Sequence, residues 1–206
     1  MRLPSPPLLV ISDRSQARRP LIEIAAAAFR GGCRWFSLRE KDLPAVARRA
    51  LLADLVALGR DCGAAVTVHD DIEAAIAADA DGVHLPAGGD PAAARARLSG
   101  KLIGASAHSA AEAASLIAAG TDYVTISPVF LTDSKPGYGP ALGLDGLAKV
   151  VAAAGGPVIA LAGITPDNAA ACMKPGAAGI AVMGEVMRAA DPEATVRALV
   201  EAIAAA

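Results

Sequence analysis

The residues best suited to bind an anion are Arg39 and Lys41, in the segment SLREK at 37–41. Their spacing of two places both side chains on the same side of an extended chain. Together they suit a pyrophosphate, because arginine binds two phosphate oxygens at once and lysine adds a point charge. Lys135 lies far along the chain and can join them, whereas an ion pair with Glu40 or a solvated rim is the alternative. Three converging cations in a protein of formal net charge −2 predict a polyanionic substrate.

Aspartates follow another apolar segment, AVTVH at 65–69, where Asp70 and Asp71 come next. Asp70 predicts a magnesium site, because Mg²⁺ takes one or two carboxylates and otherwise phosphate oxygens and water. Asp71 is expected to cap the following helix. Asp90 can serve as a second metal ligand or as the cap of a helix that begins at Pro91, and both interpretations stay open.

Two glycines occur where a phosphate-binding loop is expected. They are Gly163 in LAGITPDN (161–168) and Gly184 in VMGEVM (182–187). Glycine lets the backbone approach an anion closely, and the N-terminus of a helix favours negative charge. The alternative is that these glycines only turn the chain.

These residues need a scaffold, and the sequence alternates short apolar runs with helical segments. Continuous hydrophobicity is typical of strands covered on both faces, as in a parallel sheet. Alanine-rich segments at 21–32, 44–63 and 109–120 start near proline or serine, end in glycine, and predict crossover helices. The expected strands are at 8–12, 34–38, 65–69, 82–85, 101–106, 122–127, 157–161 and 178–183.

Eight such units predict an α/β fold, a single (β/α)₈ TIM barrel domain over residues 1–206. An open doubly wound sheet is the alternative, although no G-x-G-x-x-G segment follows a strand. In a barrel the active site lies at the C-terminal face of the strands. His84 falls inside an apolar run and is expected to be a hydrogen-bonded core residue. Polar residues that follow the runs and join the candidate site are Ser37, His69, Ser106, Thr132 and Ser134.

Composition excludes several classes of protein. The net charge of −2 and an aromatic content of 3% offer little to a nucleic acid. No run approaches the ~20 apolar residues that span a membrane, and the N-terminal segment lacks the features of a signal peptide. Three widely spaced cysteines favour a reducing, cytoplasmic location.

The chain resembles thiamine-phosphate synthases and the related TenI-type thiazole tautomerases over nearly its whole length. The order and spacing of several segments carry the resemblance. They are ISDR (11–14), FSLREKD (36–42), VHDDIEAAIAADADGVHL (68–85), IGASAHSAAEA (103–113), DYVTISPVFLTDSKPG (122–137), ALAGITPDNAA (160–170) and GAAGIAVMGEV (176–186).

This resemblance implies an enzyme that joins hydroxymethylpyrimidine pyrophosphate to a thiazole phosphate, with Mg²⁺, to give thiamine phosphate and pyrophosphate. By the same resemblance, Arg39, Lys41 and Lys135 would hold the pyrophosphate, and Asp70 the magnesium. Thr132 and Ser134 would lie by the thiazole or its phosphate, Gly163 and Gly184 would supply backbone donors, and Ser106 would lie near the pyrimidine.

Five positions depart from the family pattern. Ser37 and His69 replace a glutamine and an asparagine, and Asp90 is shifted by one extra residue. Pro128 stands where the tautomerases have a histidine base, and Gly184 replaces a common serine. The synthase is the main expectation. A thiazole tautomerase and a non-catalytic barrel that binds thiazole or thiamine phosphate are the alternatives, and a homo-oligomer is left open.

Overall fold

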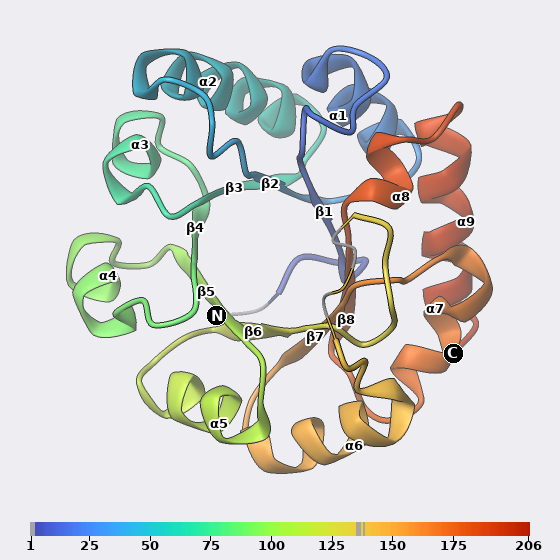
Figure 1. The fold of residues 1–206 in the computed structure, drawn as a ribbon. Helices are drawn as coiled ribbons and strands as arrows, with labels where there is room; N and C mark the ends of the chain where they lie inside the picture. The colour runs from blue at the N-terminus through green and yellow to red at the C-terminus, as the bar shows by residue number, and fades with distance from the viewer. Residues whose placement is uncertain (1–2, 135–136, 138) are drawn as a thin grey trace.

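The computed structural model describes residues 3–134, 137 and 139–206, in which eight parallel strands form a closed barrel (Figure 1). Each strand overlaps the apolar run expected for it. The strands are β1 (Leu8–Ile11), β2 (Trp35–Leu38), β3 (Ala65–His69), β4 (Gly82–Leu85), β5 (Leu102–Ala107), β6 (Tyr123–Ile126), β7 (Val158–Leu161) and β8 (Gly179–Val182).

Pairing of the first and last strands closes the sheet. Leu9 of β1 lies opposite Ala181 of β8, and Val10 lies opposite Val182. The expected barrel is therefore confirmed, and the open-sheet alternative is wrong.

Helices surround the barrel, as Figure 1 shows. Side-chain caps define where several of them begin, because Asp71, Asp90, Ser109 and Asp191 each accept a hydrogen bond from the backbone N–H three residues later. The helices are α1 (Leu21–Arg30), α2 (Ala45–Asp61), α3 (Ile72–Ala77), α4 (Pro91–Arg97), α5 (Ala110–Ala118), α6 (Gly143–Ala154), α7 (Pro166–Met173), α8 (Gly184–Met187) and α9 (Pro192–Ala204). Of the helices in the described ranges, none is long and apolar enough to cross a membrane.

Alternation along each strand separates two cores. One set of side chains packs between the strands and the helices, and includes Phe36 and Ile103. The other set fills the barrel interior, where Trp35 and Tyr123 meet edge to face with ring centroids 4.7 Å apart. This inner core fills the barrel toward the N-terminal ends of the strands. Space for a ligand therefore remains toward their C-terminal ends.

Candidate active site

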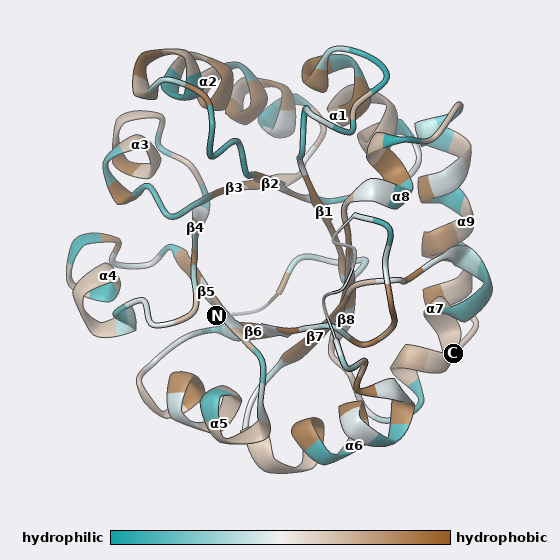
Figure 2. Ribbon diagram, in the orientation of Figure 1, coloured by the Kyte–Doolittle hydropathy of each residue, from teal (hydrophilic) through white to brown (hydrophobic). Residues whose placement is uncertain are grey.

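A cavity of about 430 Å³ opens at the C-terminal ends of the strands. Figure 2 shows hydrophobic strands around the barrel and hydrophilic residues in the loops that follow β1 and β2. Nine of the residues expected in the site line this one cavity: Ser37, Arg39, Lys41, His69, Ser106, Thr132, Ser134, Gly163 and Gly184.

Arg39 and Lys41 follow β2 and line the cavity, whereas the intervening Glu40 turns toward the end of β1. The carboxylate of Glu40 accepts hydrogen bonds from Ser12 Oγ at 2.6 Å and from the Arg14 backbone N–H at 3.1 Å. Burial raises the pKa of the Glu40 carboxyl. Within the described part of the chain, neither Arg39 nor Lys41 forms an ion pair. Their positive charges are therefore available to a ligand.

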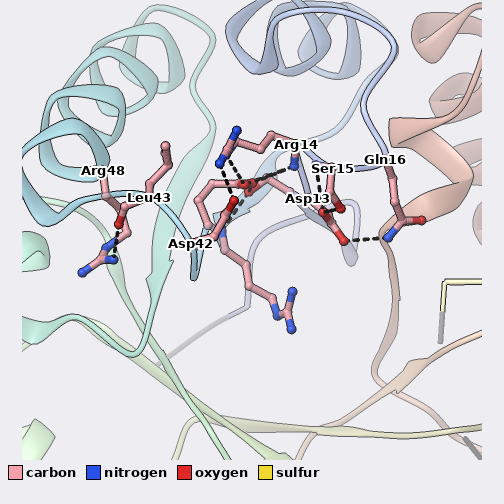
Figure 3. Close-up of polar contacts among 10 residues, drawn as sticks. Asp13, Arg14, Ser15, Gln16, Asp42, Leu43 and Arg48 are labelled. Carbon is pink, nitrogen blue, oxygen red and sulfur yellow. Dashed lines mark hydrogen bonds and ion pairs between the residues drawn. The ribbon is translucent and has the colours of Figure 1, made fainter.

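Charged residues in the loops beside Arg39 and Lys41 pair with one another, so their carboxylates do not pair with these two cations. Figure 3 shows Arg14 reaching Asp42, with which it forms an ion pair. It also shows Asp13 accepting hydrogen bonds from Ser15 and Gln16 (Figure 3). The charges of this loop are thus partly paired.

A hydrogen-bonded histidine lies at the base of the cavity. His84 is only 5% exposed, and its ring nitrogens lie 3.0 Å from Tyr123 Oη and 3.0 Å from Ser106 Oγ. Burial, followed by the nearby His69 and Arg39, lowers the pKa of His84 to about 3. The ring is therefore neutral at pH 7, and it is both the core histidine expected from the sequence and part of the cavity wall.

His69 stacks against His84 with ring centroids 5.8 Å apart. Its Nε2 is buried and has no hydrogen-bond partner in the described structure. Burial, and then the charges of Arg39 and Lys41, lower the pKa of His69 to about 4. The uncharged ring lines the cavity, while Nε2 itself is shielded from solvent within the wall.

Tyr123 fits beneath His84 because the neighbouring strand has a glycine, Gly104, beside its ring. A Cβ atom at Gly104 would overlap the Tyr123 ring, so only glycine leaves room for it. Tyr123 in turn hydrogen-bonds His84 through its hydroxyl. The position of the cavity floor therefore depends on a pair of adjacent strands, β5 and β6.

Across the mouth, Gly163 and Gly184 follow β7 and β8. Gly163 has φ +65°, and a Cβ there would lie 2.6 Å from the Cβ of Phe130, so this position requires glycine. Asn168 Nδ2 donates to the Gly163 carbonyl at 2.9 Å, which fixes the loop at the start of α7. Both glycines bring backbone to the cavity wall, as a phosphate-binding loop requires.

Comparison with known proteins agrees with this geometry. The family model for thiamine monophosphate synthase matches residues 8–186. The chain belongs to the thiamine monophosphate synthase family. It is 41% identical over 200 residues to a thiamine-phosphate synthase of Roseiflexus sp. (strain RS-1), covering 96% of this chain and 85% of that protein. It is 42% identical over 205 residues to one from Methanoculleus marisnigri, with 97% and 96% covered.

A solved structure of the same family has the same fold. Thiamine phosphate pyrophosphorylase from Pyrococcus furiosus superposes with a TM-score of 0.87 at 34% identity, covering 96% of this chain and 95% of that one. The family resemblance expected from the sequence is confirmed.

The residues expected to hold magnesium lie outside the cavity lining of this family member. Asp90 caps α4, accepting from the Ala93 N–H at 3.0 Å, while Asp71 caps α3 as expected. Asp70 is exposed at the end of β3, and its carboxylate accepts no hydrogen bond from any described residue. Asp70 and the second oxygen of Asp90 are hard donors of the kind that Mg²⁺ prefers, so the residues fit this ion. The described residues contain no group of three or more ligating side chains.

Lys135 lies outside the described residues, so its place relative to Arg39 stays a prediction. Sequence reasoning missed Arg188, which follows α8 and lines the cavity. The sequence does contain a signal for Arg188, because it follows Gly184 by four residues and residues four apart are neighbours on a helical turn. Gly184 has no side chain, so the space beside it is open to the Arg188 side chain.

Proposed function

We propose that this protein is a thiamine-phosphate synthase, which joins hydroxymethylpyrimidine pyrophosphate to a thiazole phosphate and releases pyrophosphate. The observation that carries the proposal is one cavity with unpaired cations on the β2 side and glycine loops on the β7 and β8 side. Two anion-binding regions in one cavity suit one substrate with a pyrophosphate and another with a phosphate. The names of the family relatives support the same reaction.

The reaction that we propose begins with departure of pyrophosphate. The bond between the pyrimidine methylene carbon and the pyrophosphate oxygen breaks, and the electron pair leaves with the oxygen. The thiazole nitrogen then supplies the electron pair of the new carbon–nitrogen bond. Arg39 and Lys41 would stabilise the negative charge on the departing group, and Lys135 is proposed to do the same.

The neutral ring of His69, which lines the cavity near Arg39 and Lys41, would contact the substrate. Ser106 and Ser37 would contact the pyrimidine, whereas Thr132 and Ser134 would contact the thiazole or its phosphate. Holding the two substrates together supplies much of the rate acceleration, because no general base is needed for the carbon–nitrogen bond.

A bound Mg²⁺ would neutralise charge on the pyrophosphate, and Asp70 and Asp90 are the residues proposed to hold it. The catalytic unit is proposed to be the single barrel domain of residues 1–206. We also infer a cytoplasmic location, supported by three free cysteines, two of which are buried. The substrates are small phosphorylated molecules, and the sequence predicts no nucleic acid partner.

The test is a direct assay with the purified protein, Mg²⁺ and both substrates, with thiamine phosphate and pyrophosphate measured together. Equal amounts of the two products are expected, with none when either substrate is omitted. Arg39→Ala is expected to form thiamine phosphate about 10²–10³-fold more slowly than the parent. A parent protein that releases no thiamine phosphate overturns the proposal. Isomerisation of the thiazole alone would then support the tautomerase, and binding without turnover the non-catalytic barrel.

A further inference from the structure

The guanidinium of Arg188 fills the space that a side chain at Gly184 would occupy. A Cβ atom built on Gly184 would lie 2.6 Å from Arg188 Cζ and would overlap Arg188 Nη1 and Ser134 Oγ. The Arg188 N–H donates to the Gly184 carbonyl at 3.0 Å, so Arg188 follows Gly184 by one turn and folds back over it. Glycine at 184 is thus what allows the guanidinium to reach the cavity wall.

Two loops hold this guanidinium in place. Arg188 Nη1 donates to Gln16 Oε1, from the loop after β1, and to Ser134 Oγ at 3.1 Å, from the loop after β6. Ser134 Oγ itself donates to Gln16 Oε1 at 2.9 Å. The described part of the β6–α6 loop is drawn near β1 and α8 in Figure 1, in agreement with these hydrogen bonds. The nitrogens Nε and Nη2 of Arg188 donate to no other described residue.

Only neutral groups contact the charge. Among the described side chains, no carboxylate lies within ion-pair distance of Arg188. Glu185 lines the same cavity, and burial raises the pKa of its carboxyl while Arg188 lowers it. An arginine fixed by an amide oxygen and a hydroxyl, with two donors unused on a cavity wall, is arranged to bind an anion.

The geometry points to Arg188 as the residue that binds the phosphate of the thiazole substrate and makes the enzyme select the phosphorylated thiazole. This inference rests on the proposed function and adds a side chain to the glycine loops at 163 and 184. A planar guanidinium binds a phosphate through two parallel hydrogen bonds, whereas a thiazole alcohol offers no such partner. Arg188 is therefore a specificity-determining residue for one substrate and leaves the other unaffected.

The first experiment compares Arg188→Ala with the parent. The KM for the thiazole phosphate is expected to rise roughly 10- to 100-fold, as for loss of a charge-assisted hydrogen bond. The KM for the pyrimidine pyrophosphate should stay unchanged, and the preference for the phosphorylated over the unphosphorylated thiazole should fall by the same factor. The matched control is Arg19→Ala, which removes an exposed arginine that donates to the Ala190 carbonyl outside the cavity. An unchanged KM for the thiazole phosphate in Arg188→Ala overturns the inference.

A second variant tests the geometry itself. Gly184→Ala should displace the flexible end of Arg188 and reproduce most of the loss, with little effect on thermal unfolding. In the Arg188→Ala background the same substitution should cost much less, because only Ser134 Oγ remains for the new Cβ to displace. Independent, additive losses from the two changes would contradict the proposed contact.

Failure of the proposed function can be told apart from failure of this inference. Isothermal titration of the parent, Arg188→Ala and Arg19→Ala with the thiazole phosphate, and separately with inorganic phosphate, requires no turnover. The phosphate site is supported and the proposed function is rejected if the parent has no synthase activity but Arg188→Ala binds these probes at least 10-fold more weakly than the parent. An active parent with equal affinity in all three proteins rejects the site and keeps the function.

Discussion

Ser12 and Glu40 join the ends of β1 and β2 through a buried hydrogen bond of 2.6 Å. Ser12 Oγ also accepts the Arg39 N–H at 2.8 Å, so one hydroxyl fixes both Glu40 and the backbone of the residue that faces the cavity. This contact explains why Arg39 and Glu40, although adjacent, point to different sides. It also keeps the Glu40 carboxylate out of the cavity lining that contains Arg39.

Ser12→Ala is expected to lower the free energy of unfolding by about 1–3 kcal/mol, because it leaves the Glu40 carboxylate and the Arg39 N–H short of a partner. Chemical denaturation measures the change. Ser15→Ala is the matched control, since its hydroxyl donates to Asp13 at an exposed position and its loss should cost no more than ~0.5 kcal/mol. Equal stabilities of the two variants would show that the buried contact is not needed.

Arg39→Ala and Lys41→Ala should unfold like the parent, within ~0.5 kcal/mol, because neither cation pairs with a described residue. Turnover should fall by about 10²–10³, the scale for removing one group that stabilises developing negative charge. Lys135→Ala is expected to behave alike. Steady-state kinetics beside thermal unfolding tests this, and full turnover in any of these variants rules out the role of that residue.

Glu185→Gln is expected to strengthen binding of the thiazole phosphate about 5-fold at pH 8, because it removes a negative charge from the cavity wall near Arg188. Burial raises the pKa of Glu185, so its carboxyl begins to be protonated above its usual range as the pH falls. The affinities of variant and parent should therefore differ less at pH 5 than at pH 8. Calorimetric titrations at both pH values test this, and an equal affinity at pH 8 contradicts it.

Stability should decrease as the pH falls below about 6.5, in part because of His84. Its pKa drops from 6.5 to about 3 on folding, so between these values the unfolded chain binds a proton that the folded protein does not. One such group changes the free energy of unfolding by at most about 1.4 kcal/mol per pH unit, and its effect fades within about one pH unit above 6.5.

His84→Gln should therefore show a shallower loss of stability between pH 6 and 4, whatever its stability at pH 8. His108→Gln removes an exposed histidine and is the control. Denaturant titrations at several pH values give the slopes, and parallel slopes for His84→Gln and the parent would disprove the assignment.

Local patterns in the sequence were sufficient to predict the barrel. The strands are buried on both faces, so each appears as an apolar run, and Asp71 and Asp90 mark helix starts through residue type alone. Most of the candidate site followed from the same runs, because the residue after each strand must lie at one mouth. The nine lining residues expected from the sequence share that origin.

Arg188 could not be predicted from the sequence as a site residue, because its position depends on residues that are distant along the chain. Gln16 and Ser134 lie 172 and 54 residues away along the chain, and the space for the guanidinium comes from an absent side chain at Gly184. The same reason applies to Glu40. The sequence offers it as an ion-pair partner of Arg39 and Lys41, but its carboxylate accepts a hydrogen bond from Ser12, which follows β1. Periodicity places a residue at the mouth, but it does not reveal which neighbour across the barrel the residue contacts.

Gly104 and Tyr123 have a consequence for engineering new specificity. The Tyr123 ring, which hydrogen-bonds His84, is accommodated inside the barrel by the bare backbone of Gly104 on the neighbouring strand. A smaller residue at 123 would deepen the cavity without altering Arg39, Lys41 or Arg188. Libraries that seek larger heterocyclic substrates can therefore vary the β5–β6 pair inside the barrel and keep the anion-binding loops constant.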